Sequence, residues 1–134
     1  MGAGVILRVG DRTSIFDSTA TRFLAEVSGE LKSKRNDFQL QRGLMSGGTC
    51  EATAYQEFGY QTAAVCVALG NYHNCGVANQ IKAEYVSLAD ACSMVELLVS
   101  VAKRMPRYAQ LTARLPRQLK QLLRQAEKRL IASA

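Results

Sequence analysis

The 134-residue chain has no uninterrupted run of about 20 apolar residues, which a membrane-spanning helix requires. Its longest stretch without a charged side chain, residues 58–81, contains Asn, Gln, His and three glycines. The N-terminus also lacks the basic segment, apolar run and small-residue cleavage site of a secretory signal. We therefore expect a soluble, cytoplasmic protein for which a membrane is not a partner.

C-x-x-C pairs are also absent, although the chain has four cysteines, Cys50, Cys66, Cys75 and Cys92. This absence excludes a zinc ribbon and a thioredoxin-type redox motif. An even count is compatible with two disulfides, but a chain with 48% apolar residues can build a core without them. We expect buried, reduced thiols.

Acidic residues are nearly absent from the C-terminal part of the chain. From Lys103 onward, nine Lys or Arg residues accompany the single acid Glu127, so this segment carries +8. The first 102 residues hold eight basic and ten acidic groups and carry −2. The overall charge of +6 therefore belongs to one segment, and nucleic acid is not expected as a partner of the whole domain.

Aliphatic runs alternate with amphipathic segments along the chain. Strands are predicted near residues 5–9, 38–43 and 62–69, the last as a central parallel strand covered on both faces. Helices are predicted over residues 18–31, 50–58, 87–105 and 108–131, the last kinked or divided by Pro116.

This order of elements predicts an α/β fold, because parallel strands need crossovers of about a dozen residues and helices supply them. We expect residues 1–105 to form half of a three-layer sandwich with a mostly parallel central sheet. Residues 106–134 are predicted as a basic amphipathic helical extension. The simplest expectation for this helix is that its leucine stripe packs on the sheet while its charges stay in water.

Two loops follow predicted strands, where open α/β sheets collect ligands. In residues 46–51, glycines allow close backbone approach, and a helix N-terminus suits a carboxylate or a developing oxyanion. By composition alone, a tight turn with Thr49 as helix cap is the favoured explanation of the same residues. Residues 70–76 contain the only histidine, His73, and a lone histidine is usually a surface or hydrogen-bonded residue.

In this order and spacing the two loops resemble a known family. Ser-Gly-Gly-Thr-Cys-Glu-Ala-Thr-Ala at 46–54, a buried strand ending at Leu69 and Gly-Asn-Tyr-His-Asn at 70–74 carry the resemblance. They are similar to the C-terminal half of the catalytic domain of the two-metal aminopeptidases of the glutamyl and deblocking aminopeptidase group. Residues 4–17 resemble the same family's strand and following turn, so the similarity spans residues 4–101.

The resemblance implies a hydrolase that cleaves the N-terminal peptide bond of a peptide substrate with two zinc or cobalt ions. In such an enzyme His73 would ligate one ion. The substrate site would be lined by Gly47, Gly48 and Thr49 and by their neighbours Cys50, Glu51, Asn71 and Tyr72. Many members continue the Gly-Gly-Thr motif with aspartate, where this chain has cysteine. We also expect a homo-oligomer.

Most of a two-metal site is missing from the sequence. Such a site needs about five protein ligands, including a bridging carboxylate, and a carboxylate base. This chain has one histidine and no Glu-Glu pair, and the family carries its other ligands and base in the N-terminal half of the domain. We therefore interpret the chain as a C-terminal part, either truncated or one product of a split gene, whose partner is the missing half. Alone, it is expected to bind no metal and to be inactive.

Two other hypotheses remain open. The runner-up is a non-catalytic binding or assembly module whose basic C-terminal helix docks an acidic partner, nucleic acid or an anionic membrane. Dinucleotide binding through Gly2-Ala3-Gly4 is weakly supported, because the third glycine of G-x-G-x-x-G is absent and the glycines precede the strand.

One expectation joins the two loops in space. Parallel strands deliver their C-terminal loops to one rim of a sheet, so His73 and the Gly47-Gly48-Thr49 turn should line one cleft. A ligand histidine should hold one ring nitrogen on a carbonyl or carboxylate and point the other into the cleft. Without the partner half, that nitrogen should face solvent beside an unusually apolar surface.

Overall fold

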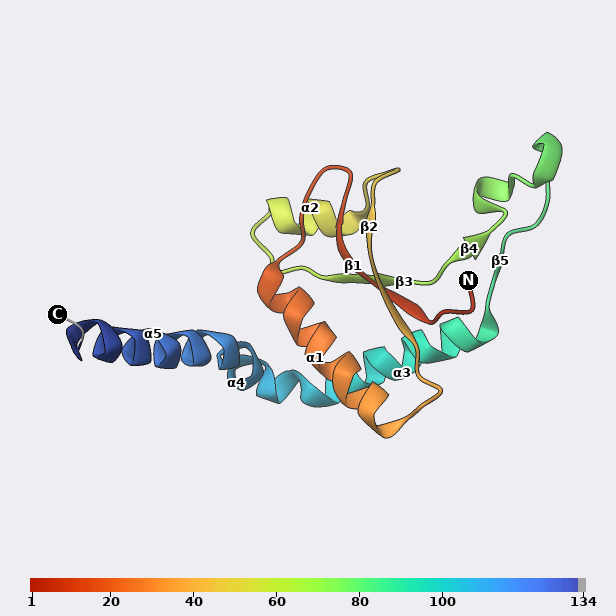
Figure 1. Cartoon of the computed structure of the whole chain (residues 1–134). Helices are drawn as coiled ribbons and strands as arrows, with labels where there is room; N and C mark the ends of the chain where they lie inside the picture. Colours follow the sequence, from red (N-terminus) through yellow and green to blue (C-terminus); the bar gives the residue numbers. More distant parts are fainter. Residues whose placement is uncertain (133–134) are drawn as a thin grey trace.

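A computed structural model describes residues 1–132 (Figure 1). The strands are β1 (Val5–Asp11), β2 (Leu40–Met45), β3 (Ala64–Cys66), β4 (Leu69–Gly70) and β5 (Tyr85–Val86). The α-helices are α1 (Ser18–Lys34), α2 (Glu51–Glu57), α3 (Leu88–Arg104), α4 (Tyr108–Thr112) and α5 (Arg114–Ala132). Three short 3-10 turns are η1 (Tyr72–Asn74), η2 (Val77–Asn79) and η3 (Met105–Arg107).

The three predicted strands share one sheet, in the order β2-β1-β3. β1 pairs parallel with β2, from Val5 opposite Leu40 to Asp11 opposite Met45. β3 pairs antiparallel with β1, so the prediction of a central parallel strand at residues 62–69 is wrong. Of the three, β1 is the central strand.

The short helix α2 explains why β3 runs backwards. Its seven residues rise only about 10 Å, whereas the seven-residue β1 is about 23 Å long. A parallel β3 would require the chain to return to the end of the sheet where β1 starts, and α2 is too short to carry it there. The chain enters β3 at the end where β2 stops and runs in the opposite direction.

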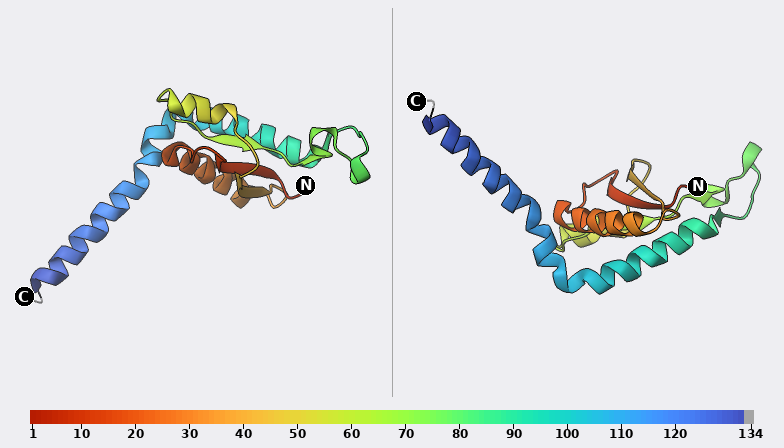
Figure 2. Two further views of the ribbon diagram at one scale, coloured as in Figure 1. Left: turned by 90° about the horizontal axis from the view of Figure 1, so that it is seen from above. Right: turned by 60° about the horizontal axis from the view of Figure 1, so that its bottom comes forward.

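Helices α1 and α3 lie side by side against β1 (Figure 2). Their contact forms the hydrophobic core, which consists of Val5, Phe23, Val27, Leu31, Phe38 and Leu97. α1 begins where the sequence predicted, because the Asp17 carboxylate accepts a hydrogen bond from the Ala20 N–H at 2.7 Å. The α/β class is thus confirmed as a small mixed sheet with packed helices, and the three-layer sandwich stays a prediction.

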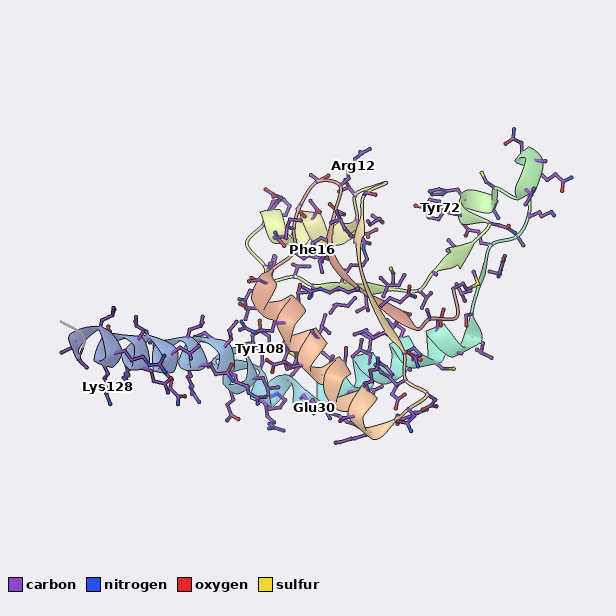
Figure 3. All side chains as sticks on the ribbon, viewed as in Figure 1. Arg12, Phe16, Glu30, Tyr72, Tyr108 and Lys128 are labelled. Atoms are coloured by element: carbon purple, nitrogen blue, oxygen red, sulfur yellow. The ribbon has the colours of Figure 1, made fainter. Side chains whose placement is uncertain are left out.

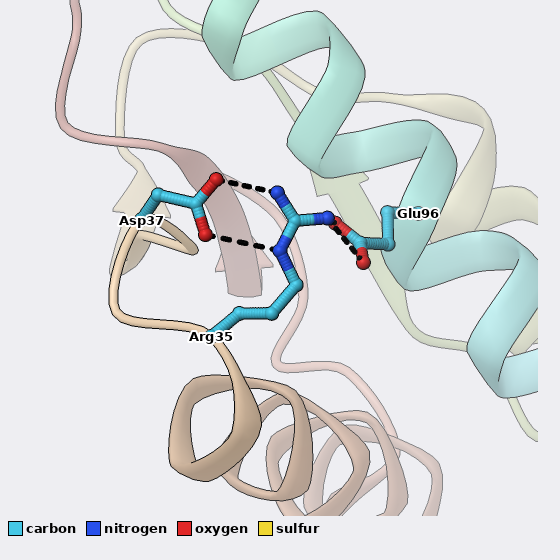
Figure 4. Close-up of polar contacts among 3 residues, drawn as sticks. All are labelled: Arg35, Asp37 and Glu96. Atoms are coloured by element: carbon cyan, nitrogen blue, oxygen red, sulfur yellow. Dashed lines mark hydrogen bonds and ion pairs between the residues drawn. The ribbon is translucent and has the colours of Figure 1, made fainter.

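Arg35 connects the end of α1 to α3 across the surface (Figure 4). Its guanidinium donates to both Glu96 oxygens at 2.8 Å and to Asp37 through Nε at 3.0 Å and Nη2 at 2.5 Å. Hydrogen bonds to Asp37 and Glu96 hold the pKa of Arg35 above its usual range, and the bond from Arg35 lowers the pKa of Asp37. Because these groups are solvated, the cluster orients the two helices more than it stabilises them.

The C-terminal helix does not pack on the sheet, so that expectation is wrong. α4 and α5 are separate helices, and α5 projects away from the body of the molecule (Figures 1 and 2). The predicted division by Pro116 is confirmed, because proline has no N–H for the Thr112 carbonyl four residues earlier. That carbonyl instead accepts a hydrogen bond from Arg22 Nη2 at 2.5 Å, which ties the end of α4 to α1.

The four cysteines are free, as expected, but none is fully buried. Cys50 and Cys66 are half-buried, and Cys75 and Cys92 are exposed. The expectation of buried thiols is therefore wrong. Among residues 1–132, no helix combines the length and the apolar character needed to cross a membrane.

We expect Asp90→Ala to lower the free energy of unfolding by about 2–4 kcal/mol, because it leaves the buried N–H of Gly4 and the partly buried N–H of Gly2 without an acceptor. The buried Asp90 carboxylate accepts from the N–H groups of Gly2 at 2.7 Å and Gly4 at 2.8 Å, so it ties the N-terminus to α3. Urea denaturation measures the loss, and the exposed Glu57→Ala is the control. Equal midpoints for the two variants would contradict this role.

Candidate functional site

The first candidate loop, residues 46–51, is built around a carboxylate that sequence analysis did not single out. Asp11, at the end of β1, is only 3% exposed. It accepts hydrogen bonds from Cys50 N–H at 2.9 Å and from the Thr53 hydroxyl at 2.6 Å. It also accepts from the N–H groups of Thr13 at 2.8 Å and Ser14 at 3.0 Å.

These bonds set the protonation state of Asp11. Burial by itself would raise the pKa of the carboxyl, but the four donors outweigh it and hold the pKa far below its usual range. Asp11 is therefore an anion at the N-terminus of α2. The position in which the sequence predicted a bound carboxylate or oxyanion is filled by the chain's own side chain.

The rest of this loop is tied to the segment after β1. Arg12 N–H donates to the Gly48 carbonyl at 3.0 Å, and the hydroxyls of Thr13 and Thr49 are 2.5 Å apart. Figure 3 shows Arg12 beside the end of β2. The alternative of a tight turn at a helix start thus describes much of the loop, although Thr49 is not the cap: α2 begins after Cys50, which makes no side-chain capping bond.

The second candidate loop is a projecting arm, which we define as residues 69–86. β4 and β5 form its two-stranded base, and η1 and η2 form its tip. Side-chain amides hold it together: Asn71 donates to the Ala83 carbonyl at 2.8 Å and Asn74 to the Lys82 carbonyl at 3.3 Å. Asn71, predicted to contact substrate, therefore already has a structural partner.

His73 lies exposed on this arm. Its backbone is left-handed, with φ of 57°, a conformation that is uncommon for residues other than glycine. Its N–H donates to Glu84 Oε1 at 2.7 Å, and its ring lies 4.1 Å from the Tyr72 ring, centroid to centroid. Tyr72, labelled in Figure 3, is also exposed. Within residues 1–132 neither ring nitrogen of His73 has a hydrogen-bond partner, so the expectation that a carbonyl or carboxylate holds one of them is wrong.

The arm that carries His73 exposes large apolar side chains, together with the charged residues Lys82 and Glu84. The large exposed side chains of the arm are Leu69, Tyr72, Val77, Ile81, Tyr85 and Val86.

The two loops do not share a cleft, so that prediction is wrong. β2 and β3 run in opposite directions, and the loops that follow them leave from opposite ends of the sheet (Figure 1). The Gly47–Thr49 turn lies at the end of β1 that carries Asp11, and the arm with His73 extends beyond the other end. The metal assignment of His73 thus gains no support from the Gly-Gly-Thr turn.

Arg8 is a further residue that sequence analysis missed. Its guanidinium is buried on β1, 5.7 Å from the centre of the Phe16 ring, and its Nε and Nη2 have no hydrogen-bond partner among residues 1–132. It lines an open groove of about 290 Å³ together with Cys66. Burial raises the pKa of the Cys66 thiol, and the nearby Arg8 charge opposes the rise.

No three His, Cys, Asp or Glu side chains within the described part of the chain come close enough together to hold a metal ion. No protein-family model matches the sequence, and no curated protein sequence matches it.

Solved structures do match. The TET aminopeptidase from the marine sediment archaeon Thaumarchaeota archaeon SCGC AB-539-E09 superposes with a TM-score of 0.62 at 20% identity, over 83% of this chain and 29% of its own. PhTET1-12s, a dodecamer, superposes with a TM-score of 0.56 at 22% identity, over 76% of this chain and 27% of its own. The chain shares its fold with part of a TET aminopeptidase. It spans less than a third of the length of either TET structure, and at these identities the likeness shows the fold alone.

Proposed function

We propose that this chain is the C-terminal part of the catalytic domain of a metal-dependent aminopeptidase of the glutamyl and deblocking type. The complete enzyme would hydrolyse the N-terminal peptide bond of peptides. The observation that carries the proposal is the match of 76–83% of this chain to TET structures of which it covers only 27–29%.

The described residues do not fit a two-metal site by themselves, because about five ligands are needed and no three candidates converge. Under this proposal His73 contributes one imidazole nitrogen to a zinc or cobalt site, and the N-terminal half supplies the other ligands and the base. The exposure of His73 and the large apolar side chains that the same arm exposes support the assignment. The buried, unpaired N–H groups of Arg8 also suit a surface that meets another part of the protein.

Substrate contacts are assigned to two separate places. The first place is the arm beside His73, where we assign Tyr72 and Asn71. Tyr72 is exposed there, and Asn71 bonds the Ala83 carbonyl through its amide nitrogen, which leaves its amide oxygen for substrate. A substrate role for Gly47, Gly48, Thr49, Cys50 and Glu51 stays a prediction. Since this loop leaves the other end of the sheet, its contribution has to be tested independently of His73.

A cytoplasmic homo-oligomer is the assembly we propose for the complete enzyme, since one of the matching structures is a dodecamer. We also propose that the chain has two parts, a catalytic part at residues 1–105 and a basic helical extension at residues 106–134. Exposure of α5 favours the second candidate function, a binding or assembly module, for that extension alone.

Aminoacyl-arylamide hydrolysis with added zinc or cobalt tests the catalytic role. We expect no appreciable turnover from this chain alone, because of its ligand deficit, and turnover when it is co-expressed with the polypeptide encoded directly upstream. His73→Ala should then lower activity more than about 100-fold, beyond the loss typical of outer-shell changes. The control is Gln80→Ala, an exposed substitution on the same arm.

Two results would contradict the proposal. An inactive complex would reject the function itself. Metal-dependent turnover by this chain alone, abolished by His73→Ala, would show that the remaining ligands come from elsewhere, such as a second copy.

A further inference from the structure

Helix α5 exposes an apolar stripe along its whole length. It has 19 residues, about 28 Å, and none of them is buried. Five leucines recur at the three- and four-residue spacing of one helix face and are between 42% and 69% exposed: Leu115, Leu119, Leu122, Leu123 and Leu130. α5 points away from the body (Figure 2), and of the five leucines only Leu115, at the start of the helix, lines a pocket with residues of β1 and α1.

The opposite face of α5 is basic. At 100° per residue, Arg117, Lys120, Arg124 and Lys128 fall within one sector opposite the leucines. Lys128 projects into solvent in Figure 3. With Arg114, Arg129 and the single acid Glu127, the helix carries six positive charges and one negative charge, a net +5. None of these bases forms an ion pair within residues 1–132.

This combination of faces restricts what can cover the stripe. A second copy of α5 would bring +5 against +5, without the acidic flanking residues that stabilise paired helices. A nucleic acid would neutralise the bases but leave the leucines in water. An anionic lipid bilayer offers both an apolar layer and negative charge to one helix, and interfacial helices have this leucine and basic composition.

We propose that α5 lies in the plane of an anionic membrane surface, with its leucine stripe in the boundary between headgroups and acyl chains. Its basic side chains then extend toward the lipid phosphates. The expectation that a membrane is not a partner relied on the lack of a spanning segment, and a helix that lies on the surface needs none. The inference does not depend on the proposed peptidase function.

Co-sedimentation of the full chain with vesicles tests the proposal. We expect binding to vesicles of equal phosphatidylcholine and phosphatidylglycerol, weaker binding to pure phosphatidylcholine, and release by salt. The stripe variant Leu119→Gln/Leu122→Gln should bind at least about 10-fold more weakly, since each leucine side chain contributes several apolar carbons. Gln121→Ala, beside the basic sector on the side of the helix away from the leucines, should bind as the parent does.

Charge variants separate the two faces. The double variant Lys120→Glu/Arg124→Glu should bind the mixed vesicles more than about 10-fold more weakly, because each lost positive charge costs roughly fivefold in affinity. The conservative double variant Lys120→Arg/Arg124→Lys keeps both charges and should bind as the parent does. Because no core residue lies on α5, all variants should keep the thermal transition of the parent protein.

Fluorescence locates the helix in the bilayer. The chain has no tryptophan, so Leu122→Trp introduces a single reporter. We expect a blue shift on the mixed vesicles and stronger quenching by lipids brominated near the headgroup than by lipids brominated at the chain ends.

Four outcomes would overturn the proposal. The first is no binding to the mixed vesicles, and the second is stripe variants that bind as the parent does. The third is a dimer, seen in sedimentation equilibrium, that the stripe substitutions dissociate. The fourth is RNA or DNA that competes with the vesicles for the protein and still binds the leucine variants.

Discussion

Replacing Asp11 by asparagine is expected to lower the thermal unfolding midpoint by several degrees at pH 7. The Asp11 carboxylate accepts four hydrogen bonds and joins the end of β1 to the start of α2. An asparagine amide has only one acceptor oxygen, and its NH₂ group would face N–H donors. At least one buried donor near Cys50 would lose its partner, and the 46–51 loop would loosen.

The effect of Asp11→Asn should also depend on pH. The pKa of Asp11 in the folded protein is below the ordinary value of 3.8, so the folded state binds fewer protons than the unfolded state in this range. The contribution of the carboxylate is therefore fully present above about pH 4 and is lost as the pH falls through the folded pKa. The difference in midpoint between the parent and the variant should shrink on acidification.

Asp37→Asn is the matched control, because Asp37 is an exposed carboxylate whose partner Arg35 keeps its bonds to Glu96 (Figure 4). Thermal scans at pH 7 and pH 3 measure both variants. If Asp11→Asn behaved like the control at pH 7, the carboxylate would not be what holds the loop.

Leu97→Ala is the second substitution for which we expect a large effect, a loss of about 2–5 kcal/mol in the free energy of unfolding. Leu97 is 0% exposed in the core between α1, α3 and β1. Removing its side chain leaves a cavity, because the rigid sheet and two helices cannot close around it. Urea denaturation measures the change.

Val95→Ala on the same helix is the control, since Val95 is 58% exposed and lies outside the core cluster. Its loss should be within about 0.5 kcal/mol. A similar loss for both variants would mean that α3 does not pack as the structure has it.

Local patterns were sufficient to predict most of the elements. β-branched runs marked β1, the three- and four-residue spacing marked α1 and α3, and Pro116 marked the division between α4 and α5. These features depend on neighbours within a few residues, where propensity and capping act. The resemblance also led to a fold that matching TET structures share.

Strand direction and the partners of side chains could not be predicted in the same way. The reversal of β3 depends on where α2 ends relative to the sheet, and strand periodicity is the same for both directions. Two of the four partners of Asp11, Cys50 and Thr53, lie about 40 positions away in the sequence, so no local pattern singled out this carboxylate. The bonds of Asp90 to Gly2 and Gly4 span more than 80 residues and gave no local signal.

By itself, the sequence determined the α/β class, the positions of the main helices, the concentration of positive charge after Lys103 and the lack of a complete set of metal ligands. Composition and short-range spacing are sufficient for each of these. The tertiary structure alone decided that His73 and the Gly47–Thr49 turn lie at opposite ends of the sheet, that Asp11 fills the N-terminus of α2, and that α5 leaves its leucines exposed. These outcomes depend on which surfaces meet, and an amphipathic stripe has the same pattern whether it packs on its own sheet or on a partner.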